Sequence, residues 1–243
     1  MQTRVPDNLS KTGIMKKLFL LLFLPCALWA QNKNIFVNAQ LHRDFNREAF
    51  TSTIEIFELD KLGTTFFFTD YDYYSTGQTG SYFELARNFA VLRLKPTIAN
   101  LSVQYNDGVL DIDGLTGKQI PRTGLFGVAF SNITFGQAYF ELQGLARQEF
   151  GADLGWQFTG VWSVPIGHTP FQFLGYLDWF NHNYRDQPSV ILAEPQLLVR
   201  SRQWAIGSEL EISRNYSGAY TKSDGFEYKK WYAHPTLFVR VDF

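Results

Sequence analysis

Apolar residues recur at every second position through most of this chain. Near the C-terminus, Leu237, Val239 and Val241 alternate with a second set that includes Arg240 and Asp242. The segments 153–163 and 204–213 alternate in the same way. Because successive side chains of a β-strand point to opposite faces, this period predicts strands with one apolar face rather than amphipathic helices.

Turn residues divide the alternating chain into twelve segments of strand length. The alternation is poorest in the sixth segment, between Leu125 and Phe130. The expected strands are 34–45, 49–60, 63–74, 80–92, 97–106, 120–131, 134–146, 150–165, 170–183, 188–201, 204–216 and 227–243.

The connections between these segments differ in length in a regular way. Every second connection is short, at 61–62, 93–96, 132–133, 166–169 and 202–203, whereas the two longest, 107–119 and 217–226, belong to the other set. Short turns at one rim and longer loops at the other are typical of outer-membrane β-barrels. An even number of strands also places both chain ends at the same rim.

The start of the chain carries an export signal. Met15, Lys16 and Lys17 precede an unbroken apolar run at 18–24, and the small residue Ala30 precedes a polar segment. This arrangement is typical of a secretory signal peptide, and the run is too short for a membrane-spanning helix. We expect residues 1–14 to be an over-extended start, 15–30 a cleaved signal peptide and 31–243 a single barrel domain.

Cys26 is the only cysteine, and it lies inside this signal. A lipoprotein anchor at Cys26 is an alternative, but Pro25 stands where a small residue is expected. With cleavage after Ala30 the mature chain has no cysteine, which excludes a disulfide, a cysteine-ligated metal and a cysteine nucleophile.

The mature chain is mildly acidic. Residues 1–30 contain Arg4, Lys11, Lys16, Lys17 and Asp7, a net charge of +3, so the rest of the chain carries −1 − 3 = −4. No basic surface for nucleic acid is therefore expected.

Aromatic residues make up 17% of the chain, yet no apolar run after Gln31 is long enough for a spanning helix. Hydrocarbon cannot hydrogen-bond to exposed backbone groups, so a sheet in a bilayer must close on itself. We therefore predict an all-β fold, a closed antiparallel transmembrane β-barrel of about twelve strands, monomeric in the lipid of a bacterial outer membrane. The alternative is a soluble sheet or sandwich with scattered surface aromatics.

Several aromatic residues lie near the ends of the predicted strands, as interfacial girdles require. They are Tyr73, Tyr74, Trp156, Trp162, Trp179, Trp204, Trp231 and Tyr232. The chain ends on Phe243, directly after an alternating strand. This end resembles the signal read by the outer-membrane barrel assembly machinery, which we expect as a partner.

Four segments carry a resemblance to a known family. They are Thr53-Ile-Glu-Ile-Phe-Glu-Leu-Asp-Lys-Leu-Gly63, Thr65-Phe-Phe-Phe-Thr-Asp70, Tyr82-Phe-Glu-Leu-Ala-Arg87 and Leu101-Ser-Val-Gln-Tyr-Asn-Asp107. The stretch resembles the DUF5020 family of Bacteroidetes, which is similar to the nucleoside-specific, Tsx-type channel proteins. The resemblance covers about a quarter of the chain. It implies a twelve-stranded monomeric barrel, but it does not reach the family's ligand-contacting residues.

Polar residues of the alternating segments are expected to line the lumen, and acids outnumber cations among them. Such a lumen disfavours anions and favours cations or neutral polar solutes. Aromatic residues interleave with the acids, and a nucleobase with its ribose could use an aromatic face beside a hydrogen-bond acceptor. The candidate lumen and solute-binding residues are Glu55, Phe66, Phe68, Asp70, Asp72, Glu84, Arg87, Tyr139, Glu141, Tyr176 and Asp178.

We therefore predict a passive channel for small polar solutes, with nucleosides as one candidate class. One alternative is a structural or adhesion barrel in which acids pair with arginines and plug the lumen, with Glu84–Arg87 as the expected pair. Its loop 107–119 has an acidic spacing that hints at Ca²⁺ but lacks a suitable terminal glutamate.

A lipid-modifying enzyme is the third class. No serine lies in a Gly-x-Ser-x-Gly context, and no pair of histidines has metal-ligand spacing. We expect neither catalysis, nor a cofactor, nor a metal.

Overall fold

The computed structural model describes residues 34–243 except 76, 78, 112–116, 182–187, 217–226 and 228, and it leaves out the side chains of 111 and 117–119. The predicted signal peptide and Cys26 lie outside the described residues. No helix within the described part of the chain is long and apolar enough to cross a bilayer.

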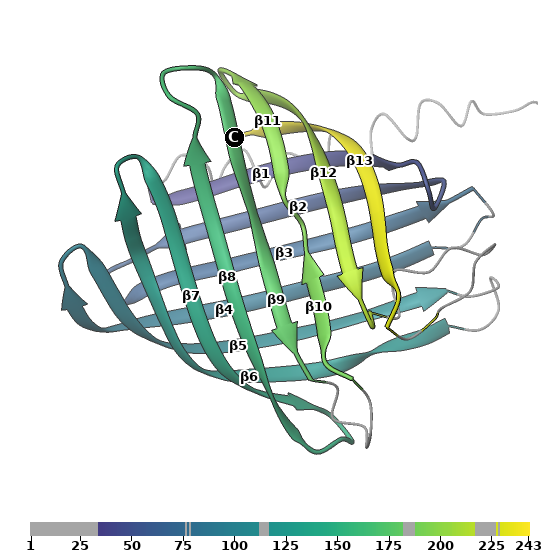
Figure 1. The fold of residues 1–243 in the computed structure, drawn as a ribbon, viewed down its shortest axis with the longest axis horizontal. Helices are drawn as coiled ribbons and strands as arrows, with labels where there is room; N and C mark the ends of the chain where they lie inside the picture. The colour runs from purple at the N-terminus through teal and green to yellow at the C-terminus, as the bar shows by residue number, and fades with distance from the viewer. Residues whose placement is uncertain are drawn as a thin grey trace, which may run out of the picture.

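The described chain forms one antiparallel sheet that closes into a barrel (Figure 1). The closing pair is β1 with β13, in which Gln40 is opposite Arg240. The strands are β1 (Ile35–Asp44), β2 (Ala49–Leu59), β3 (Gly63–Tyr74), β4 (Thr79–Leu94), β5 (Thr97–Asp111), β6 (Gly117–Phe135), β7 (Ala138–Glu149), β8 (Leu154–Pro165), β9 (Phe171–Phe180), β10 (Val190–Ala193), β11 (Gln196–Ser201), β12 (Trp204–Arg214) and β13 (Trp231–Asp242).

The segments β10 and β11 are two halves of one strand. Leu192 is opposite Asp178 and Gln196 is opposite Leu174, so both halves keep the same register with β9. The interruption falls at Pro195, which has no N–H to give to the ladder. Counted in this way the barrel has twelve strands, and the predicted fold class is confirmed.

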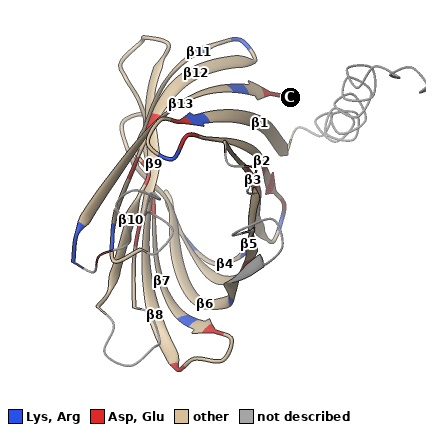
Figure 2. Ribbon diagram, turned by 90° about the vertical axis from the view of Figure 1, so that its right-hand side faces the viewer, with Lys and Arg blue, Asp and Glu red and all other residues tan. Residues whose placement is uncertain are grey.

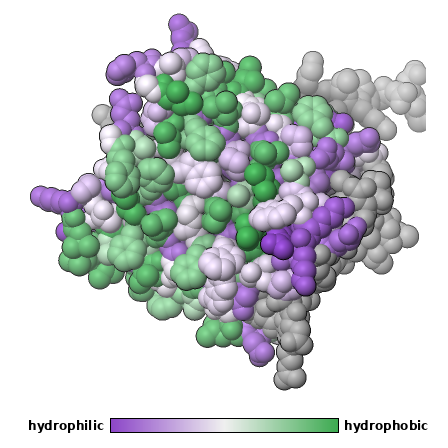
Figure 3. Space-filling view, viewed as in Figure 1, coloured by the Kyte–Doolittle hydropathy of each residue, from purple (hydrophilic) through white to green (hydrophobic). Residues whose placement is uncertain are grey.

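The two faces of the wall differ as the alternation predicts. In β1, Gln40 and His42 are buried while Leu41 between them is 52% exposed. In β12, Glu211 is buried and Ile206 is 61% exposed. We call the face that carries Gln40, His42 and Glu211 the inner wall. The opposite face is largely hydrophobic, with hydrophilic side chains gathered toward the ends of the strands (Figure 3).

The short connections lie at one rim, together with Asn34 and Phe243. They are β2–β3, β4–β5, β6–β7, β8–β9 and β11–β12. The longer connections lie at the other rim, which faces the viewer in Figure 2. The two rims differ as predicted, but the predicted long connection 107–119 is wrong, because β5 continues to Asp111 and β6 begins at Gly117. We call these two rims the turn rim and the loop rim.

One predicted turn is wrong. The chain does not reverse at 132–133, because β6 continues to Phe135 and the turn falls at Gly136, with φ 60°. At Asn132, with φ 57°, the ladder with β7 is instead irregular between Phe130 and Ile133. Asparagine tolerates this left-handed conformation in bulges as well as in turns, so its sequence signal was ambiguous.

The aromatic girdle is partly as predicted. Trp156 contacts Trp179 on the outer face near the loop rim, with ring centroids 4.9 Å apart. Tyr74 and Tyr232, however, lie on the inner wall, opposite Ala49 and Ser213. A position near a strand end does not determine which face of the barrel a side chain is on. The two-residue period of the strand determines it.

Candidate functional site

Residues opposite each other in an antiparallel ladder share a face, so the register assigns the inner wall strand by strand. Its acidic side chains are Asp44, Glu55, Asp70, Asp72, Glu84, Glu141, Glu149, Asp178, Glu194, Glu209, Glu211 and Asp242. The guanidinium groups on the described inner wall come from Arg47, Arg147, Arg200 and Arg240. Acids therefore outnumber cations by a wide margin.

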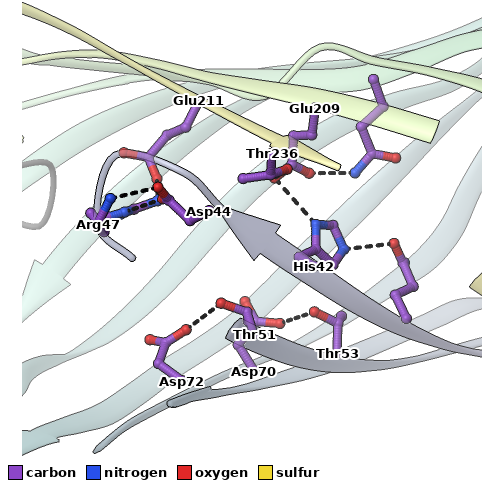
Figure 4. A network of polar contacts seen from close by, with 12 residues as sticks. His42, Asp44, Arg47, Thr51, Thr53, Asp70, Asp72, Glu209, Glu211 and Thr236 are labelled. Atoms are coloured by element: carbon purple, nitrogen blue, oxygen red, sulfur yellow. Dashed lines mark hydrogen bonds and ion pairs between the residues drawn. The ribbon is translucent and has the colours of Figure 1, made fainter. Parts of the chain in front are cut away.

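The first cation lies at the loop rim, where the turn between β1 and β2 folds inward (Figure 4). Asp44 accepts the backbone N–H groups of Asn46 and Arg47 at 2.8 and 2.7 Å. The Arg47 guanidinium donates to Asp44 at 2.5 Å and to Glu211 of β12 at 2.7 Å. Burial lowers the pKa of Arg47, but the Glu211 and Asp44 charges raise it more, so the net shift is upward and Arg47 stays charged.

Two further cations lie toward the turn rim. Arg200 and Arg240 both pair with Asp242, and Arg240 also approaches Glu55 at 3.7 Å. Asn38 donates to the same Glu55 carboxylate at 2.7 Å. The charges near this end of the lumen are therefore partly compensated.

Carboxylates between these ends are held by neutral donors. Thr51 donates to Asp72 at 2.6 Å, Thr53 to Asp70 at 2.5 Å, and each threonine lies directly across the ladder from its acid (Figure 4). Across the lumen, Thr159 donates to Asp178 at 2.6 Å. Threonine satisfies lone pairs but carries no positive charge, so none of these contacts compensates an ionised carboxylate.

Among the described residues, none of Asp70, Asp72, Glu84, Glu141 and Asp178 lies within ion-pair distance of a lysine or arginine. The predicted lattice of neutralised acids is therefore absent from this part of the described wall.

An aromatic row adjoins these acids on β3 and β4. Phe66 and Phe68 have ring centroids 5.9 Å apart, and Tyr82 lies 5.8 Å from Phe68. The Tyr82 hydroxyl donates to Glu84 at 2.5 Å, and Asn106 donates to the same carboxylate oxygen at 3.0 Å. The structure thus brings together the predicted residues Phe66, Phe68, Asp70, Asp72 and Glu84.

Other predicted residues line the facing part of the wall. Tyr139 donates to Glu141 at 3.0 Å. Asn88 reaches the same acid across the intervening strands at 3.4 Å. Tyr176 and Asp178 both face inward from β9. The Asn88–Glu141 contact thus spans part of the lumen at this level.

Arg87 is not a lumen residue, and the expected Glu84–Arg87 pair is wrong. Arg87 lies opposite Thr65 on the outer face and donates to Thr65 and to Asp60, both at 2.9 Å. Residues three apart in a strand point to opposite faces, so Glu84 and Arg87 cannot both face inward. The hydrogen bond from Arg87 lowers the pKa of the Asp60 carboxyl.

Sequence reasoning missed several lumen residues. Arg47 was placed in a connection, although its spacing from Asp44 is a signal for the contact between them. Arg147 was assigned to a turn, but it lies within β7 on the inner wall, two residues before the strand ends, and donates to Gln157 at 2.7 Å. Tyr216, beyond β12, is half-buried, and desolvation, with the Glu211 and Glu194 charges, raises its pKa.

The described residues contain no group of three or more histidine, cysteine or acidic side chains arranged to hold a metal ion. His42 is used for packing, because its ring stacks on Phe238 at 4.8 Å and hydrogen-bonds to Gln40 at 3.0 Å.

The sequence matches a family model described as "Domain of unknown function (DUF5020)" over residues 32–243. No curated protein sequence matches the chain. The KdgM porin structure is similar, with a TM-score of 0.52 and 8% identity, over 86% of this chain and 99% of that chain. A second structure, described as a KdgM porin "in complex with disordered oligogalacturonate", has a TM-score of 0.50 and 7% identity, over 86% of this chain and 99% of that chain.

The NanC porin structure gives a TM-score of 0.53 and 11% identity, over 85% of this chain and 98% of that chain. At these identities the likeness shows a shared fold alone. A twelve-stranded barrel with porin-like architecture points to a bacterial outer membrane.

Proposed function

The chain belongs to the DUF5020 family, and we propose that it is an outer-membrane channel for the passive diffusion of small polar solutes, favouring neutral or cationic solutes over anions. The observation that carries this proposal is the inner wall, on which acids outnumber arginines and three of the acids are held by threonines.

A lumen wall with one dominant sign of charge raises the local concentration of oppositely charged solutes and repels like charge. The named ligand of one KdgM structure, oligogalacturonate, carries many carboxylates. The acidic wall of this barrel opposes such a ligand, so the shared fold does not carry the same solute preference with it.

Nucleosides are the solute class that the aromatic row supports best. Phe66, Phe68 and Tyr82 offer ring faces, on which any base can stack. Asp70 and Glu84 lie beside them and accept hydrogen bonds, which ribose hydroxyls can donate. Nucleosides carry no phosphate, so this acidic wall does not repel them as it repels nucleotides.

A structural barrel with a filled lumen is the second candidate. It is favoured by the hydrogen bonds that cross between strands that are not neighbours, Asn88 to Glu141 at 3.4 Å and Gln104 to Gln143 at 2.6 Å.

Uptake into proteoliposomes tests both candidates. We expect purified barrels to admit uridine faster than uridine monophosphate and galacturonate, because the two acids meet the negative wall. Replacing Phe68 by leucine should reduce the advantage of uridine over a neutral pentose. Equal uptake with protein-free liposomes would favour the filled barrel, and faster uptake of the anions would contradict the assigned selectivity.

A further inference from the structure

A groove of about 460 Å³ lies on the outer face of the barrel over β9, β11, β12 and β13. Two rows of side chains line it. One row is Leu237, Ser208 and Leu197, and the next is Pro235, Leu210 and Pro195. The lining is almost wholly apolar, and its volume is within the roughly 300–1,000 Å³ of small-ligand sites.

The floor of the groove is shaped by its two prolines. Leu210 N–H donates to the Pro195 carbonyl at 3.0 Å, and Phe45 N–H donates to the Pro235 carbonyl at 3.4 Å. Proline has no N–H to return, so each of these pairs keeps one of its two ladder bonds. The Leu210 and Phe45 carbonyls therefore receive no hydrogen bond from the proline opposite. On a lipid-facing wall, a hydrogen-bond donor of a bound molecule would stabilise these carbonyls.

One arginine lies beside the groove, on its β1 side. Arg43 is opposite Leu237, at the end of the first row, and its guanidinium lies 4.8 Å above the Phe50 ring.

We propose that this groove binds an anionic membrane lipid, with one acyl chain along the two rows and its phosphate on Arg43. The groove is lined from the outer face of the barrel, so a hydrocarbon chain reaches it without leaving the bilayer. Guanidinium groups bind phosphate through charge-assisted hydrogen bonds. A headgroup or acyl-chain hydroxyl is suited to the freed carbonyls.

The chain offers a matched control for the headgroup contact. Arg122 also lies near the loop rim above an aromatic ring, Phe150 at 5.7 Å, but on β6, away from the groove. Arg43→Gln and Arg122→Gln therefore remove equivalent charges, and only Arg43 borders the groove.

Native mass spectrometry of the intact barrel, titrated with phosphatidylglycerol or phosphatidylcholine, tests the proposal. We expect Arg43→Gln to weaken phosphatidylglycerol binding about tenfold, the size of one charged hydrogen bond. Arg122→Gln and wild type should bind it equally, and phosphatidylcholine binding should not respond to either change. Ser208→Phe, which fills the groove from the outer face, should reduce binding of both lipids.

Equal losses of phosphatidylglycerol affinity in Arg43→Gln and Arg122→Gln would overturn the proposal, because any arginine near the loop rim would then support lipid binding. Unchanged binding in a folded Ser208→Phe barrel would also overturn it. Because Arg43 faces outward, its replacement leaves the lumen intact, and solute uptake by the same variant separates this result from the channel proposal.

Discussion

Replacing Arg47 by glutamine should lower the free energy of unfolding by about 3 kcal/mol, the cost of leaving a buried ion pair without one partner. Arg47 is the cation between Asp44 and Glu211, whose side chains are 4% and 9% exposed. Without it, these carboxylates would face each other with no compensating charge at the loop-rim end of the lumen.

The same variant should also increase the preference of the channel for cations, since a positive charge leaves an acidic constriction. Urea unfolding in lipid vesicles measures the first effect and ion selectivity measures the second. Arg47→Lys keeps the charge but cannot donate to both acids at once, as the planar guanidinium does. Its free energy of unfolding should therefore lie between those of the wild type and Arg47→Gln. A glutamine variant as stable as wild type would show that the Arg47 contacts are not formed in the membrane.

Replacing Gly63 by alanine should destabilise the barrel by about 3 kcal/mol or prevent its assembly, because backbone strain and overpacking add at one site. Gly63 starts β3 with φ 149°, a conformation that side chains disfavour. An added Cβ would lie 1.9 Å from the Asn88 carbonyl oxygen of β4. Both obstacles are backbone features, so side-chain rearrangement cannot relieve them.

Two other glycines separate the two causes. Gly136 has φ 60° but nothing within 4 Å of an added Cβ, so its alanine variant should cost only about 1 kcal/mol of strain. Gly124 has neither problem and should tolerate alanine. The shift between folded and heated forms on a denaturing gel measures folded yield. A Gly63→Ala barrel as abundant as Gly124→Ala would contradict the register of β3 and β4.

The two-residue alternation of apolar side chains and the lengths of the connections were enough to predict the closed barrel, because both can be read from local sequence. The sixth strand alternates poorly for a reason visible only in the structure. Leu125 and Ala129 face inward there, so its inner and outer faces are both apolar. Long polar side chains of the two flanking strands, such as Gln104 of β5 and Gln143 of β7, hydrogen-bond to each other over these apolar inner residues of β6.

The candidate site was predictable in its acids and aromatics but not in Arg47, Arg87 and Arg147. Glu84 and Asp70 followed from period two, and the same rule applied strictly would have placed Arg87 outside. Arg47 enters the lumen because a turn folds inward onto Glu211, which is 164 residues away in sequence. The threonine donors to Asp70 and Asp72 also depend on cross-strand register, which no local pattern carries.

The reversal potential of single barrels in a planar bilayer under a KCl gradient tests the central claim most directly. An acidic lumen predicts open-channel current with K⁺ preferred over Cl⁻. The combined variant Asp70→Asn, Asp72→Asn and Glu84→Gln should lose most of this preference, while the outward-facing Arg87→Gln should keep it. A folded wild-type barrel that passes no current, or that prefers Cl⁻, would contradict the account.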